Sequence, residues 1–282
     1  MIRVYSEKNI NKASVTELWQ ECFGDSAEYI SFFLNNCPEY TCICYLNDNN
    51  HPVSMLFLID GYLNGQDCKY LYAACTSAQY RRQGIMEQLI SFAKGFAFDA
   101  GSSGIFLVPA NEKLYSYYSK FGFIASFKKK QVIISTIECN NAQVSREYCY
   151  SDLVSLKKEL SSEFESFIFN DMIIEYTIKE HLFNGGDIYF NSDTKTLAFY
   201  YETENKIIVK EILSVSANIK DAINEVFVNN KGKNIYILCP VVYNNTDIVE
   251  EYAKCGMCFP LNEKMKTYLE NNREVYAGMY LD

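Results

Sequence analysis

Tyr80-Arg-Arg-Gln-Gly-Ile-Met86 is the stretch that decides the fold of this 282-residue chain. The segment before it, Lys69 to Thr76, predicts a strand, whereas Ile85 to Ala100 predicts a helix that ends at Gly101. At such a turn the first N–H groups of the helix have no intrahelical partner and point outward, with the positive end of the helix dipole behind them. The turn therefore predicts a pyrophosphate site, in which Gly84 allows close approach and two neighbouring arginines add charge.

The segments around this turn predict a domain with a mixed, mostly antiparallel sheet flanked by helices. Helices are expected at Ser14–Phe23, Ala27–Asn35 and Glu112–Lys120, the last closed by Gly122. Strands are expected at Ile2–Tyr5, Thr41–Leu46, Val53–Ile59, Gly104–Pro109 and Gln131–Ile137. The fold class is therefore α/β, of the α+β kind.

The second half of the chain repeats this order of segments. Strands are expected at Asp187–Asn191, Thr196–Glu202, Lys206–Leu213 and Asn234–Pro240, with a helix at Ile219–Val228 before the last of them. Tyr252-Ala-Lys-Cys-Gly-Met257 matches Tyr118-Ser-Lys-Phe-Gly-Phe123 and is interpreted as the same helix. Chance similarity of two amphipathic units is the alternative, but the matching order favours a duplication. A polar stretch at Asn140-Asn141 places the boundary between domains 1–140 and 141–282.

With these segments assembled, residues 1–137 resemble the GNAT superfamily of N-acetyltransferases, which move an acetyl group from acetyl-CoA to an amine. The phosphate loop of that family, Gln/Arg-x-x-Gly-x-Gly/Ala, stands here as Arg81-Arg82-Gln83-Gly84-Ile85-Met86. Met86 departs from the pattern and either crowds the pyrophosphate or packs between helix and sheet. The duplicated layout also looks like the tandem members of the superfamily, in which one copy has degenerated.

The resemblance implies which residues hold acetyl-CoA and which one donates a proton. Main-chain groups of Ala74, Cys75 and Thr76, beside a bulge, are expected to hold the acetyl carbonyl and the pantetheine arm. Asn111 begins the family's later helical segment and is expected at the cofactor site. Tyr118 is expected to protonate the departing CoA thiolate, although a tyrosine on an aromatic helix face also serves packing.

The general base stays unassigned, with Asp60, a water chain or carboxylates of the C-terminal tail as candidates. Cys75 suggests a covalent acetyl-enzyme, but no histidine lies nearby in sequence to activate it. Direct attack of the amine within a ternary complex is therefore the expected mechanism.

The second copy is not expected to bind acetyl-CoA. Ser214 to Asp221, where the phosphate loop should fall, contains no glycine and no arginine. This domain is expected to pack on the first and shape the acceptor pocket, with Tyr252 in a structural role. A catalytically impaired CoA-binding or regulatory protein, or an aminoacyltransferase of the same fold, remains the alternative.

Composition and charge exclude other classes of protein. An apolar content of 49% with 22% charged residues excludes intrinsic disorder. Residues 1–140 carry 12 Lys+Arg against 13 Asp+Glu, and residues 141–282 carry 14 against 22, which gives the net charge of −9. Nucleic acid is a poor partner for such a chain, whereas a cationic amine acceptor would be attracted.

The cysteines and the apolar runs indicate the compartment. The 11 cysteines are an odd number in a long chain, which favours reduced thiols over a disulfide framework. Cys255 and Cys258 form a CxxC pair without a second ligand pair, so no metal is expected. No uncharged run is long enough to span a membrane, and the first residues lack the apolar region of a signal peptide. A cytoplasmic protein with no membrane partner is expected.

Overall fold

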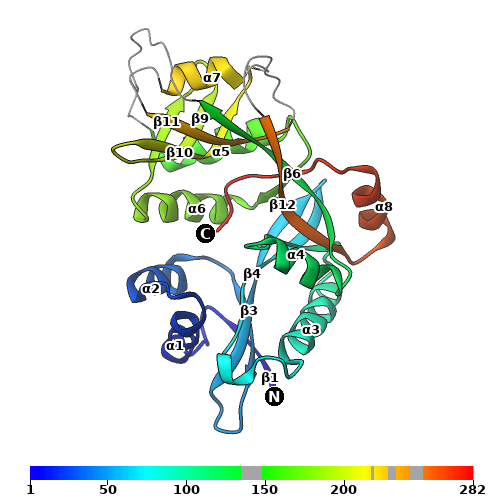
Figure 1. The fold of residues 1–282 in the computed structure, drawn as a ribbon. Helices are drawn as coiled ribbons and strands as arrows, with labels where there is room; N and C mark the ends of the chain where they lie inside the picture. The colour runs from blue at the N-terminus through cyan, green and yellow to red at the C-terminus, as the bar shows by residue number, and fades with distance from the viewer. Residues whose placement is uncertain (135–147, 217–218, 228–232, 242–249, 282) are drawn as a thin grey trace. The chain divides into compact units, whose positions relative to one another are not determined.

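The computed structural model describes residues 1–134, 148–216, 219–227, 233–241 and 250–281 (Figure 1). They form two compact units. Unit 1 comprises Met1–Ala125 and Gly256–Asn271, and unit 2 comprises Ser126–Cys255 and Asn272–Asp282. The boundary predicted at Asn140-Asn141 lies outside the described residues.

Unit 1 is built on a sheet with the order β1-β2-β3-β4-β5-β12. The strands are β1 (Ile2–Ser6), β2 (Thr41–Leu46), β3 (Pro52–Leu63), β4 (Gln66–Thr76), β5 (Gly104–Leu107) and the end of β12 (Glu250–Pro260). Neighbours are antiparallel except β4 and β5, which run parallel because helix α3 (Ile85–Asp99) connects them. The predicted mixed, mostly antiparallel sheet is confirmed.

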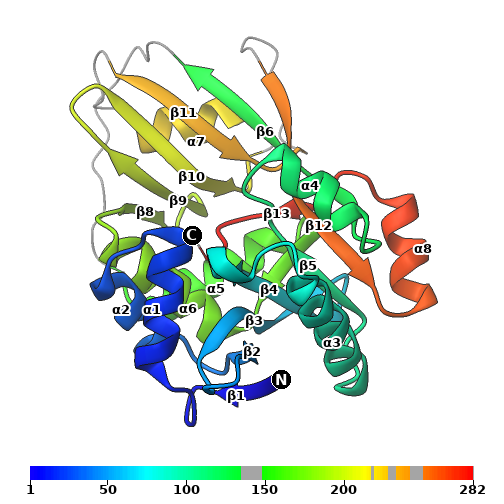
Figure 2. The ribbon, with the colours of Figure 1, turned by 60° about the horizontal axis from the view of Figure 1, so that its bottom comes forward.

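Helices cover both faces of the sheet of unit 1, as Figures 1 and 2 show. On one face, α1 (Lys12–Phe23) and α2 (Ala27–Asn36) pack an aromatic cluster in which Trp19 lies 5.4 Å from Phe57 and 5.2 Å from Phe33 between ring centroids. On the other face, α3 and α4 (Glu112–Ser119) pack on Leu56 and Leu58. Phe57 alternates with these two leucines because successive side chains of a strand point to opposite faces. The short η1 (Ala78–Tyr80) and α8 (Glu263–Asn271) complete the unit.

A β-bulge interrupts β4 near its end. Met55 on β3 pairs with Cys75 and Phe57 pairs with Tyr72, so Ala73 and Ala74 together face one residue of β3. Ala73 has a φ of 46°, a left-handed conformation that is unusual for a residue other than glycine. The bulge leaves main-chain groups outside the ladder at the end of the strand that leads into the loop at Tyr80–Met86.

Unit 2 repeats the order and directions of the strands β2-β3-β4-β5-β12 of unit 1. Its sheet runs β6-β11-β10-β9-β8, and β10 and β11 are parallel because α7 connects them. The strands are β6 (Ile124–Ile134), β8 (Asp187–Asn191), β9 (Thr196–Glu202), β10 (Lys206–Ser214) and β11 (Asn234–Cys239), with β7 (Ser166–Phe169) paired to β13 (Tyr276–Ala277). The helices are α5 (Tyr150–Ser161), α6 (Asp171–Phe183) and α7 (Ile219–Val226).

Two strands pair with strands from the other half of the sequence. β6 follows α4 along the chain but pairs with β11, whereas β12 follows β11 and pairs with β5. The interpretation of Tyr252–Met257 as a helix equivalent to the one bearing Tyr118 is wrong, because these residues lie in β12. The strand continues through apolar residues to Phe259, and Met257 to Phe259 pair with β5. A sheet edge that offers hydrogen bonds and a buried face overrides the local resemblance to a helix.

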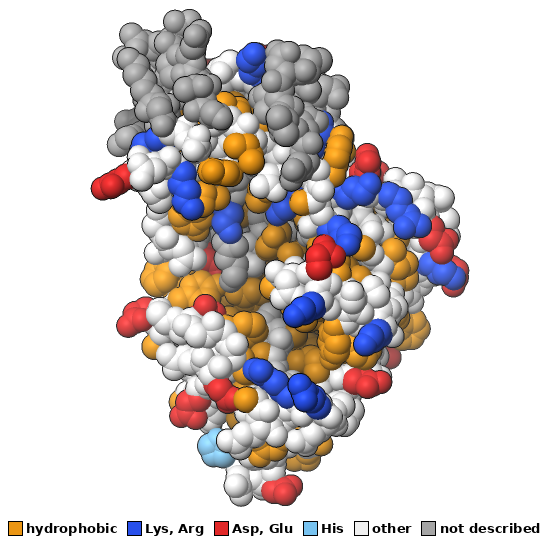
Figure 3. Space-filling model, in the orientation of Figure 1, with side chains coloured by type: hydrophobic (Ala, Val, Ile, Leu, Met, Phe, Trp, Pro, Cys, Tyr) orange, Lys and Arg blue, Asp and Glu red, His pale blue; other side chains and the backbone are white. Residues whose placement is uncertain are grey.

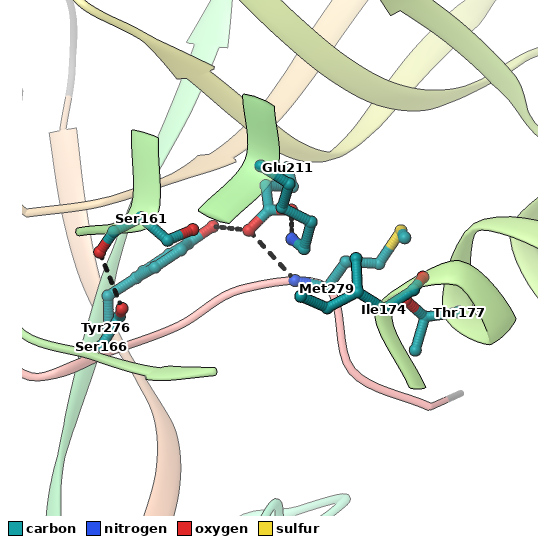
Figure 4. Close-up of polar contacts among 8 residues, drawn as sticks. Ser161, Ser166, Ile174, Thr177, Glu211, Tyr276 and Met279 are labelled. Atoms are coloured by element: carbon teal, nitrogen blue, oxygen red, sulfur yellow. Dashed lines mark hydrogen bonds and ion pairs between the residues drawn. The ribbon is translucent and has the colours of Figure 1, made fainter. Parts of the chain in front are cut away.

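A buried carboxylate in unit 2 holds the C-terminal segment. Glu211 on β10 is 1% exposed and forms an ion pair with Lys157 of α5 (Figure 4). The same carboxylate accepts hydrogen bonds from the Tyr276 hydroxyl at 3.3 Å and the Met279 N–H at 3.2 Å. Gly278 passes so close that a Cβ there would lie 1.9 Å from the Glu211 Oε1 atom. The charge of Glu211 is thus balanced and fully hydrogen-bonded, which a buried carboxylate requires.

Candidate active site

Unit 1 contains a cavity of about 540 Å³ at the turn between β4 and α3. Its wall comes from the end of α1, the end of β4, the phosphate loop, the first turn of α3 and one face of α4. The lining residues are Cys22, Phe23, Ala74, Cys75, Thr76, Tyr80, Arg81, Arg82, Gly84, Ile85, Met86, Glu87, Leu114, Tyr117, Tyr118 and Phe121. Three separate parts of the sequence, residues 22–23, 74–87 and 114–121, therefore meet at one site.

Gly84 sets the geometry of the helix mouth. It is the N-cap of α3 with a φ of 73° and a ψ of 8°, the left-handed region that costs glycine nothing. The first intrahelical bond runs from the Gln88 N–H to the Gly84 carbonyl at 3.1 Å. The N–H groups of the three residues between them, 85 to 87, have no intrahelical acceptor. The N-terminal end of α3, its mouth, is therefore suited to an anion.

The segment before the helix is held in place from two sides. Arg81 donates a hydrogen bond from its Nε atom to the Thr76 carbonyl at 2.9 Å, which folds its side chain along the cavity. Glu21 on α1 accepts a hydrogen bond from the Ala78 N–H at 2.8 Å. Arg82 has a φ of 63° and also lines the cavity. Figure 3 shows Lys and Arg side chains over this loop, beside apolar side chains that border a hollow.

Tyr118 lies on the inner face of α4, packed edge to face against Phe123 at 5.7 Å between ring centroids. It is 8% exposed and lines the cavity. Burial raises the pKa of Tyr118 well above its usual 10.0, and charge on Tyr117 and Cys75 adds to the rise. Among the described residues, none hydrogen-bonds to the Tyr118 hydroxyl. Tyr118 therefore stays protonated at neutral pH and faces the cavity as a donor.

Most residues predicted for the cofactor site line this cavity, but two do not. Asn111 is the N-cap of α4, and its side chain accepts a hydrogen bond from the Leu114 N–H at 3.2 Å. Gln83 turns its amide to the Gln79 carbonyl at 3.1 Å. Both side chains satisfy local backbone groups, so the structure does not bring them to the cavity wall. Met86 packs against the core of unit 1, as expected for a side chain between helix and sheet, and it also lines the cavity.

Asp60, one candidate for the general base, is not brought to the cavity. It lies on β3 and forms an ion pair with Lys69 on β4. The carboxylate that does line the cavity is Glu87, in the first turn of α3. The predicted helix start would have identified Glu87, because a residue two positions after Ile85 lies at the helix mouth.

Two further groups at the cavity were not predicted. Tyr117 lies beside Tyr118, and burial together with the charge of Glu87 raises its pKa. Cys22 comes from α1, and nothing in the local sequence around it indicates a site. Only the packing of α1 on the sheet brings Cys22 to the cavity that Cys75 also lines.

The described part of the chain contains no group of three or more His, Cys, Asp or Glu side chains arranged to hold a metal ion. Cys255 and Cys258 lie on β12 and are both buried, and burial raises the pKa of Cys255 to about 11. Three residues apart on an extended strand, they point to opposite faces. Every described cysteine is a free thiol. No described helix is both long and apolar enough to cross a membrane.

Comparisons with known proteins give a family match for part of the chain and a fold similarity for most of it. Residues 9–123 match the model of the Acetyltransferase (GNAT) family. The GCN5-related N-acetyltransferase from Kribbella flavida is 11% identical, with a TM-score of 0.68 over 93% of this chain and 72% of that one. Eis1 from Mycobacterium abscessus is 10% identical, with a TM-score of 0.68 over 93% of this chain and 74% of that one. A conserved protein from Enterococcus faecalis V583, described as a "Probable N-Acyltransferase", is 12% identical, with a TM-score of 0.68 over 93% of this chain and 73% of that one.

At these identities the similarity to solved structures concerns the fold, and it extends over most of the chain. No curated protein sequence matches. The family match covers the phosphate loop, the bulged strand and the helix that bears Tyr118. Residues 9–123 of this chain are therefore similar in sequence to the Acetyltransferase (GNAT) family, and the chain shares its fold with solved N-acetyltransferases.

Proposed function

We propose that unit 1 transfers an acetyl group from acetyl-CoA to a primary amine by direct attack within a ternary complex. The observation that carries the proposal is one cavity that joins the open mouth of α3 to the Tyr118 phenol. An anion-binding helix mouth and a buried proton donor are the two groups that a thioester carrying a diphosphate requires.

The residues present fit acetyl-CoA. Arg81 and Arg82 supply positive charge, and the left-handed Gly84 leaves open space where a Cβ would stand. The apolar walls, among them Leu114 and Phe121, suit a pantetheine arm. When bound, acetyl-CoA would supply an activated acyl group and a thiolate leaving group.

Tyr118 would donate its proton or a hydrogen bond to the leaving sulfur. Its raised pKa makes proton release harder, but a thiolate in the same buried site is desolvated as well, which raises its proton affinity. The main chain at the β4 bulge would orient the acyl carbonyl, since Ala74 and Cys75 line the cavity next to the unpaired positions. Cys75 contributes through its backbone.

The acceptor is proposed to be a cationic primary amine, in keeping with the acidity of the chain. Unit 2 is proposed not to bind acetyl-CoA. Its helix α7 follows a segment without glycine or arginine, whereas α3 follows Arg81, Arg82 and Gly84.

A thermal shift and a thiol-release assay test the proposal. At about 100 times its dissociation constant, acetyl-CoA should stabilise the chain by about 2.7 kcal/mol. A panel of polyamines and aminoglycosides should then release free CoA thiol. Absence of both the shift and the release would refute the proposal, whereas a shift without release across the panel would support a CoA-binding protein without transferase activity.

A further inference from the structure

Two cysteines that the proposed acetyl transfer does not use as nucleophiles meet at the wall of the cavity. Cys22, half-buried near the end of α1, and Cys75, buried on β4, both line the cavity as free thiols. Arg81 lines the same cavity, and the pKa values of the two thiols depend on each other, that of Cys22 also on the Arg81 side chain. An accessible thiol, a buried thiol and a cation therefore lie along the wall of one cavity.

The charges around the pair divide it into two unequal thiols. The hydrogen bond from Cys75, helped by Arg81, lowers the pKa of Cys22 from 9.0 to about 7 against the opposing effects of burial and Glu21. The same hydrogen bond and burial raise the pKa of Cys75 well above its usual value, with charge on Glu21 and Cys44 adding to the rise. Cys22 is thus the more readily ionised sulfur, and Cys75 is the donor that stabilises it. This is the arrangement in which a thiolate reacts and a neighbouring thiol resolves the product.

We propose that Cys22 and Cys75 form a dithiol site that reacts with small disulfides entering the cavity. The Cys22 thiolate attacks one sulfur of R–S–S–R, forms a Cys22–S–S–R bond and releases RS⁻. Cys75 then loses its proton and attacks the Cys22 sulfur, which closes a Cys22–Cys75 disulfide and releases the second RS⁻. The two cysteines are oxidised, the small disulfide is reduced, and the two thiol protons end on the released RSH molecules.

A second thiol pair in unit 1 provides an internal control. Cys42 and Cys44 on β2 lie 3.5 Å apart between sulfur atoms, but they are 0% and 1% exposed. Burial raises the pKa of Cys42 well above its usual value. This pair has contact without access, so it should stay reduced under conditions that oxidise Cys22 and Cys75.

The test treats the full chain with oxidised glutathione at pH 7, followed by acid quenching and peptide mapping without reduction. Cleavage after Lys, Arg and Glu separates Cys22 from Cys75, so a linked pair of peptides identifies the disulfide. We expect this link to form while Cys42 and Cys44 remain reduced. Oxidation of both pairs at equal rates, or of neither pair, would overturn the proposal.

Two variants assign the roles. Cys75→Ser should trap glutathione on Cys22, because no resolving thiol remains, and Cys22→Ser should leave Cys75 unmodified. Glutathione attached to Cys75 in the Cys22→Ser variant, at the rate of disulfide formation in the unaltered chain, would overturn the assignment. None of these results depends on binding or turnover of a thioester, so they are independent of the proposed function.

A labelling experiment on the unaltered chain covers the case in which a variant fails to fold. The alkylation rate of Cys22 by iodoacetamide should be half-maximal near pH 7. At pH 7 the thiolate fraction of Cys22 should be about 15-fold larger than that of an ordinary cysteine, whereas each thiolate should be about fivefold less nucleophilic. Cys22 should therefore react roughly threefold faster than an ordinary cysteine. A midpoint at or above about pH 8.5 would contradict the proposal.

Discussion

The phenol of Tyr118 on α4 and the thiol of Cys75 on β4 line the same cavity, and charge on Cys75 adds to the rise in the pKa of Tyr118. The proton donor of the proposed transfer and the resolving thiol of the proposed dithiol site are therefore electrostatic neighbours. A change in the ionisation of the Cys75 thiol therefore shifts the pKa of Tyr118, the proton donor of the proposed acyl transfer.

Replacing Tyr118 with Phe should lower kcat by ~10²–10⁴-fold, because the ring is kept and only the proton donor is removed. Acetyl-CoA binding, measured by titration calorimetry, should change little. Tyr117→Phe is the matched control on the same helix and should retain most activity. Since burial raises the pKa of Tyr118 above 10.0, Tyr118 stays protonated below that pH. Any loss of activity between neutral pH and pH 10 should therefore be the same in Tyr118→Phe as in the unaltered chain. Equal kcat in Tyr118→Phe and the unaltered chain would remove Tyr118 from the mechanism.

Replacing Gly84 with Ala should destabilise unit 1 by about 1–2 kcal/mol, because alanine at a φ of 73° is strained even where nothing crowds its Cβ. It should also weaken acetyl-CoA binding by about tenfold, through displacement of the helix mouth. Gly95→Ala is the control, since Gly95 lies in the exposed interior of the same helix with open space around it. That change should stabilise by about 0.5–1 kcal/mol and leave binding intact. Denaturant unfolding and calorimetry measure both effects, and destabilisation by Gly95→Ala but not by Gly84→Ala would contradict the geometry.

Replacing Glu87 with Gln should strengthen acetyl-CoA binding while weakening the helix. Glu87 lies in the first turn of α3, where a negative charge stabilises the helix dipole by about 0.3–1 kcal/mol but repels a diphosphate at the same place. Removal of the charge should tighten binding about twofold to fivefold at low salt, with less gain at high salt. Weaker binding at every ionic strength would show that the diphosphate lies elsewhere.

Replacing Glu211 with Gln should destabilise unit 2 by about 3–5 kcal/mol, because Lys157 keeps its charge in a buried site without a partner. The glutamine can still accept from the Tyr276 hydroxyl or the Met279 N–H, so the loss reports the charge. Glu175→Gln breaks the exposed pair with Lys179 on α6 and should cost only about 0.3–0.5 kcal/mol. The double change Lys157→Met with Glu211→Leu should recover stability relative to Glu211→Gln. Equal losses from the buried and exposed changes would refute this account.

Much of unit 1 was predictable because its elements are coded locally. The strand at Thr41–Leu46 has the predicted bounds, and α3 ends within one residue of its prediction, since apolar spacing and glycine caps act over a few residues. Gly84 as the start of α3 follows from the same local rules. The prediction of a helix at Tyr252–Met257 was wrong. It rested on a sequence match to the segment that bears Tyr118, whereas these residues lie in β12, which pairs with β5 from Met257 onward.

The site divides in the same way. The sequence by itself determined the turn at Tyr80–Met86, the start of helix α3 after it and the helix that carries Tyr118, because each depends on residues a few positions apart. Only the tertiary structure decided that Cys22 lines the same cavity as Cys75 and Arg81 and that Asn111 and Gln83 satisfy backbone groups instead. It also decided that β6 pairs with β11 and β12 with β5. These outcomes depend on contacts between distant segments, where packing and strand pairing choose among partners that local sequence does not distinguish.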